Sequence, residues 1–74
     1  MKLLDEVVLV EDLHDHRLKA GGIGTVVLIH RGGEGYEVEF MTLDGETLAA
    51  VTVLAGQVRP IAHDEIAHAR PIPT

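Results

Sequence analysis

The clearest pattern in the chain is a strict alternation of large apolar and charged residues from Tyr36 to Phe40. Tyr36, Val38 and Phe40 fall on one side of an extended backbone, and Glu37 and Glu39 fall on the other. This period of two is that of a half-buried β-strand. The segment therefore predicts a strand with its apolar face toward a core and its carboxylates toward water.

Four further segments are short and rich in β-branched residues, which favours strands. They cover residues 7–10, 23–30, 46–54 and 58–61. A glycine-rich stretch at 31–35 and the dipeptide Asp44-Gly45 are typical of hairpin turns. Gly24 lies inside the second segment, where it indicates a bulge or a close backbone approach. Five short strands with these connections predict an all-β domain that closes on itself as a small barrel.

The segment from 46 to 54 differs from simple alternation because both of its faces are apolar. Leu48, Ala50 and Leu54 share one face, whereas Ala49, Val51 and Val53 share the other. Either the strand is covered on both sides within the domain, or its outer face meets a partner. The second alternative predicts homodimerisation.

Two stretches lack any strand pattern. Residues 11–22 are mostly polar and end in Gly21-Gly22, which predicts a long surface loop. Residues 62–74 end in two prolines and predict a short tail, irregular or helical, in which Asp64 caps one helical turn through Ala69. The predicted organisation is thus one barrel over residues 1–61 and a tail over 62–74.

The composition limits the cellular setting and the chemistry. The 74 residues provide material for one hydrophobic core. There is no cysteine, which fits a reducing compartment, and we find neither a signal peptide nor an apolar membrane span. We therefore expect a cytoplasmic protein without membrane contact.

The formal charge of −6 is concentrated near the start of the chain, where five acidic residues precede residue 17 and only Lys2 opposes them. Such a surface repels phosphate backbones, because nucleic-acid affinity depends on lysine and arginine. We expect no nucleic-acid partner and a preference for a basic protein or peptide. The alternative is that these acids only solvate the surface.

No catalytic constellation is apparent. Serine and cysteine are absent, which removes the usual nucleophiles, and Glu37 and Glu39 are expected to lie in solvent. His14 and His16 flank Asp15, and these are legitimate Zn²⁺ or Ni²⁺ ligands, but nothing fixes four of them in place. We therefore expect no enzyme activity, cofactor or dedicated metal site, with the two histidines as the metal candidates.

The segment from Lys19 to Val27, followed by residues 36–40, resembles the glycine-then-valine strand of KOW and other SH3-like barrels. As a whole the chain resembles DUF4926, a bacterial family of short uncharacterised proteins. The resemblance covers about residues 1–61, through segments 1–5, 8–13, 24–27, 36–40 and 47–60. It implies a five-stranded SH3-like barrel and no catalytic residues. Two departures are the His14 to Arg17 stretch and the histidine-containing tail.

These observations predict a non-enzymatic interaction module that binds a basic partner through an edge strand and the polar loop. The expected contact residues are Glu11, Asp12, Asp15, Arg17, Leu48 and Ala50. An antitoxin-like or regulatory protein and a histidine-based metal-binding protein are the alternatives.

Overall fold

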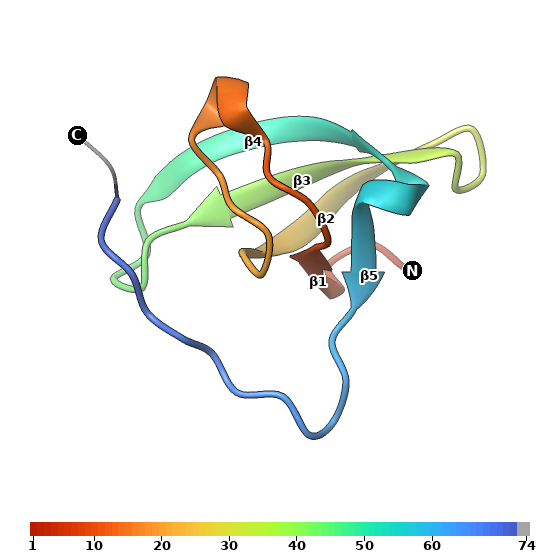
Figure 1. The fold of residues 1–74 in the computed structure, drawn as a ribbon. Helices are drawn as coiled ribbons and strands as arrows, with labels where there is room; N and C mark the ends of the chain where they lie inside the picture. Colours follow the sequence, from red (N-terminus) through yellow and green to blue (C-terminus); the bar gives the residue numbers. More distant parts are fainter. Residues whose placement is uncertain (73–74) are drawn as a thin grey trace.

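The chain forms a single curved antiparallel sheet, seen in a computed structural model that describes residues 1–72 (Figure 1). The sheet order is β4-β3-β2-β1-β5. The strands are β1 (Glu6–Leu9), β2 (Ile23–His30), β3 (Gly35–Met41), β4 (Thr47–Leu54) and β5 (Val58–Pro60). Two three-residue 3₁₀ turns complete the structure, η1 (His14–His16) and η2 (Ala55–Gln57). Neither is long enough to cross a membrane.

The predicted all-β class and the five strands are confirmed, but the predicted closed barrel is not formed. β4 and β5 are the two edges of the sheet rather than neighbours. β5 is only three residues long and pairs with β1, through Val7↔Pro60 and Leu9↔Val58. Between the edges, the amide of Leu54 donates to the side-chain oxygen of Gln57 at 2.8 Å instead of to another strand. The sheet curves without closing.

The core is built mainly from aliphatic side chains of all five strands, with Leu18 added from the segment between β1 and β2. The core includes Tyr36 and Phe40, the two aromatic residues of the chain. Its full membership is Val7, Leu9, Leu18, Val26, Tyr36, Val38, Phe40, Val51, Val53 and Val58. The alternation predicted for residues 36–40 is confirmed, since Tyr36, Val38 and Phe40 are buried and Glu37 and Glu39 face outward to bond threonine hydroxyls of β4.

Gly24 explains how β2 fits over this core. A side chain at Gly24 would collide with Val38 and would lie 2.9 Å from the ring carbon Cε1 of Phe40. The predicted close approach is therefore confirmed. The bulge lies elsewhere, between Val26 and Leu28.

The two faces of β4 have different surroundings. Val51 and Val53 are buried, whereas Leu48, Ala50 and Leu54 lie on the outer face, with Leu54 68% exposed. Within the described chain the outer face is therefore open to solvent. An open face is the condition for the second alternative drawn from the sequence, in which this face meets a partner.

Two predictions for irregular segments are wrong in part. The stretch from 11 to 22 is not a simple surface loop, because it contains η1 and sends Leu18 into the core. The tail contains no helix over 64–69: a turn at 62–65 is closed by the Glu65 carboxylate, which accepts from the Ala62 amide at 2.7 Å. From there the tail runs extended to residue 72, and residues 73–74 of the predicted tail lie outside the described residues.

Candidate functional site: a groove beside the free edge of β4

The polar segment from 10 to 22, called here the η1 loop, is held in a defined shape at its base. Leu13 and Leu18 exchange backbone hydrogen bonds of 2.8 and 3.2 Å, which makes an isolated β-bridge below η1. The side chain of Leu18 is only 4% exposed and packs with the core. The bridge and the buried side chain of Leu18 fix the base of the loop, so that η1 (His14–His16) projects away from the sheet. We call this projecting turn the spur.

Asp12 fixes the returning half of the same loop. Its carboxylate accepts a hydrogen bond of 2.8 Å from the backbone amide of Ala20. This bond holds the pKa of Asp12 below its ordinary value, with smaller electrostatic contributions from Lys19, His14 and Arg70. Asp12 therefore stays ionised and has a structural role in the loop, which leaves Glu11 and Asp15 as the carboxylates without such a bond.

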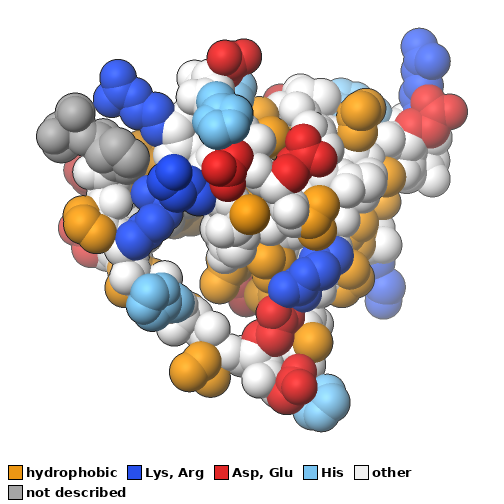
Figure 2. Space-filling view, in the orientation of Figure 1, with side chains coloured by type: hydrophobic (Ala, Val, Ile, Leu, Met, Phe, Trp, Pro, Cys, Tyr) orange, Lys and Arg blue, Asp and Glu red, His pale blue; other side chains and the backbone are white. Residues whose placement is uncertain are grey.

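The spur stands beside β4, and the space between them forms a groove of about 370 Å³. We call it the edge groove. Its lining comes from the loop residues Glu11, Asp12, Leu13, His14, Asp15 and His16, and from Val51, Thr52 and Gln57 on the opposite side. In Figure 2 acidic and histidine side chains gather at the top of the molecule, over η1. The groove is thus acidic on its loop side and open to water.

The wall opposite the spur is the unpaired edge of a strand. The amide of Ala55 donates to the carbonyl of Glu34, and further along the ladder Val53 faces Tyr36 and Val51 faces Val38. Hydrogen-bonded and non-bonded pairs alternate in an antiparallel ladder. The backbone groups of Val51 and Val53 therefore bond to β3, and those of Ala50 and Thr52 point outward to the free edge.

The structure brings together some of the predicted contact residues and separates others. Glu11, Asp12 and Asp15 line the edge groove, together with the two histidines. Arg17 does not: it lies past η1 in the left-handed region, at φ 57°, and its carbonyl accepts from the Arg70 guanidinium at 3.4 Å. The side chains of Leu48 and Ala50 lie on the outer face of β4, outside the groove lining.

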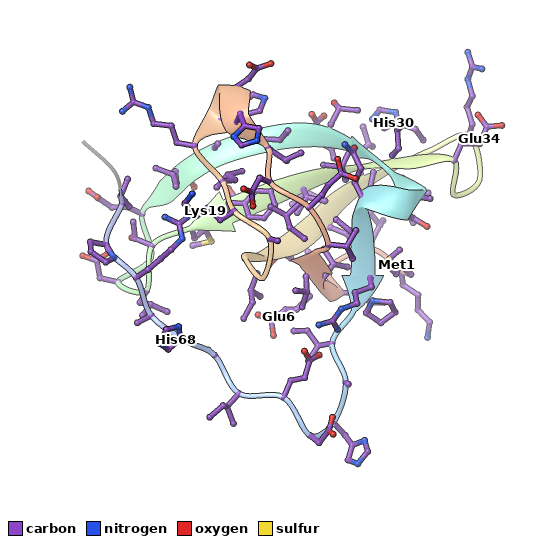
Figure 3. The ribbon with its side chains drawn as sticks, viewed as in Figure 1. Met1, Glu6, Lys19, His30, Glu34 and His68 are labelled. Carbon is purple, nitrogen blue, oxygen red and sulfur yellow. The ribbon has the colours of Figure 1, made fainter. Side chains whose placement is uncertain are left out.

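The arrangement does not assemble the metal site weighed from the sequence. Among residues 1–72, no three histidine, aspartate or glutamate side chains converge as metal ligands would. The ring nitrogen Nε2 of His30 is buried without a hydrogen-bond partner, but His30 ends β2 and stands apart from the two histidines of η1 (Figure 3).

Sequence reasoning missed Gln57 and Thr52 as groove residues. Gln57 lies in η2, and its side-chain oxygen accepts a hydrogen bond from the Leu54 amide. This bond occupies the last outward amide of β4 and so limits the length of the free edge. A signal existed in the Ala-Gly-Gln turn between two strands, but only the structure shows that this turn faces η1, because Gln57 and the residues of η1 line the same groove.

The chain is thus a small all-β domain with an open sheet edge beside an acidic loop. The sequence profile of the family described as a domain of unknown function, DUF4926, matches residues 3–60, and the chain belongs to that family. The match covers every strand and stops where the tail begins. Comparison with curated proteins and with solved structures gave no significant match.

Proposed function

We propose that this domain is a non-enzymatic interaction module, acting in the cytoplasm, whose edge groove receives a basic segment of a protein partner. The observation that carries the proposal is the position of Glu11 and Asp15 at the rim of a groove whose other wall is unpaired strand backbone. Neither carboxylate has a hydrogen bond or an ion pair within the described residues. Both are exposed and free to attract a cation.

Charge favours the same partner class on the larger scale. The chain carries 12 acidic residues against six lysines and arginines. A field of this sign accelerates the encounter with a basic surface and rejects an acidic one. The edge groove is the site at which a basic partner attracted by this field can then bind.

The test compares two charge-reversed variants of equal net charge. Glu11→Lys with Asp15→Lys inverts the charge at the rim of the groove. Glu34→Lys with Asp64→Lys makes the same change in charge at the β2–β3 turn, where Figure 3 labels Glu34, and in the tail; neither residue lines the groove. Asp12 is left intact because its carboxylate holds the loop.

We expect the tagged wild type and the control to retain the same salt-sensitive partner from a lysate of the source cells, and the groove variant to lose it. Association of the purified partner with the groove variant should slow by about tenfold at low salt. Equal recovery by both variants, or no partner with the wild type, contradicts the proposal.

A further inference from the structure

The two edges of the sheet differ in how well they are protected against an added strand. β5 is short and ends at Pro60, which has no amide hydrogen to donate. β4 is eight residues long and contains no proline and no lysine, which are the usual means of blunting an edge. The long open edge of this domain is therefore β4.

The accessible part of that edge is confined to a short stretch. At one end the Leu54 amide is already bonded to Gln57. At the other, the ladder shifts near Leu48, where Phe40 faces Ala49 and Met41 faces Thr47. Between these limits the outward amides and carbonyls of Ala50 and Thr52 face no neighbouring strand in the described chain, because β4 is the last strand of the sheet. Both residues are exposed. Thr52 lies in the wall of the edge groove, and Ala50 continues the same strand edge just beyond the groove lining.

We infer that the partner segment binds as an additional β-strand on β4, with its backbone bonded to Ala50 and Thr52 and its basic side chains toward Glu11 and Asp15. This inference rests on the proposed function and specifies its binding mode. Strand addition supplies affinity through main-chain hydrogen bonds, and the flanking side chains supply selectivity. A strand placed about 4.8 Å from β4 runs between the edge and the spur, within the groove.

Charge decides between the two occupants that an open edge admits. A second copy of this chain, pairing β4 with β4, would bring a second η1 loop and its carboxylates to the same place. Like charges brought together at an interface oppose association. An extended basic segment of another protein meets the opposite sign, so we assign the edge to that segment.

Ala50→Pro tests the binding mode without breaking the sheet. Because the Ala50 amide points outward, proline removes one edge donor and puts its ring in the path of an added strand, while the bonds of Val51 to β3 remain. Ala50→Val is the matched control, since it adds similar bulk and keeps the amide. Thermal unfolding followed by circular dichroism establishes that both variants are folded.

The probe is a display library of random dodecapeptides, selected on the wild-type protein and then synthesised individually. We expect lysine- and arginine-rich, extended sequences that lose affinity about tenfold or more on Ala50→Pro and little on Ala50→Val. Amide hydrogen exchange in the wild type gives a second readout that needs no variant. The peptide should slow exchange at Ala50 and Thr52 and leave the bonded Leu54 amide unchanged.

Each other result has a distinct meaning. Basic peptides that bind Ala50→Pro as well as wild type, without protecting Ala50 and Thr52, overturn strand addition and leave the proposed function standing. An absence of binders, or binders indifferent to Glu11→Lys with Asp15→Lys, overturns both. A dimer in sedimentation with those two amides protected in the absence of peptide assigns the edge to a second copy instead.

Discussion

At the scale of single residues, Gly24 shows what a missing side chain contributes. β2 lies against β3 so closely that the position opposite Phe40 has no room for a methyl group. The sequence indicated this much, because a glycine inside a β-branched run signals either a bulge or a close approach. It could not distinguish the two, since the choice depends on which side chains of β3 lie beneath.

Gly24→Ala should destabilise the domain by about 1–3 kcal/mol, because Val38 and Phe40 are both held by a packed core and cannot easily move aside. Urea denaturation measures the change in the free energy of unfolding. Gly56→Ala is the control, since its new methyl would meet nothing within 4 Å, and should change stability by less than about 0.5 kcal/mol. Equal effects of the two substitutions would refute this account of Gly24.

At the scale of elements, the strands and turns followed from sequence pattern far more closely than the η1 loop did. Residues 23–30 were predicted with the bounds that β2 has, because apolar periodicity reports local structure. Leu13 and Leu18 are isolated apolar residues among polar neighbours in the sequence. In the structure they form a β-bridge, and the side chain of Leu18 packs in the core. Such a contact depends on tertiary placement, which periodicity does not encode.

Leu18→Ala tests whether the core anchors the spur. Because Leu18 is buried, we expect the free energy of unfolding to fall by about 2–5 kcal/mol. This is a large share of the total free energy of unfolding of a small domain. In the folded fraction, amides of the η1 loop should exchange faster than those of β3. Leu43→Ala, at a side chain 87% exposed, is the comparison and should be close to neutral. A small effect at Leu18 would mean that the loop is held by its hydrogen bonds alone.

At the scale of the whole molecule, the sheet and the tail together differ most from the sequence-based expectation. Strand number predicted a closed barrel, yet closure depends on whether β4 and β5 meet, and the short β5 pairs on one side only. The candidate contact residues were predicted in part: the acidic loop followed from charge pattern, whereas the groove required the placement of η2 and β4 beside it.

Within residues 1–72, one ion pair joins the tail to the sheet. The guanidinium of Arg59, in β5, donates to both carboxylate oxygens of Glu65 at 2.7 and 2.6 Å. Farther along, residues 67–70 and 72 line a hollow of about 750 Å³ together with residues 40–44 of β3 and the β3–β4 turn. Figure 1 shows this part of the tail running from β5 toward that turn. The first turn of the tail therefore depends on the charge of Glu65.

That dependence predicts release of the first turn of the tail in acid. The Arg59 hydrogen bonds, with the Ala62 amide, lower the pKa of Glu65 from 4.5 to about 2. A lowered folded-state pKa means that this contribution is complete above about pH 4.5 and is lost as pH falls toward 2. NMR titration of the Glu65 carboxyl should give a midpoint near 2 in the wild type and a higher midpoint, shifted toward 4.5, in Arg59→Met. At about pH 5 the Ala62 amide should exchange slowly in the wild type and rapidly in the variant.

Because the core ends at Val58, both proteins should show the same β-sheet circular dichroism at that pH. A wild-type midpoint near 4.5 would show that the tail is not held by this pair in solution.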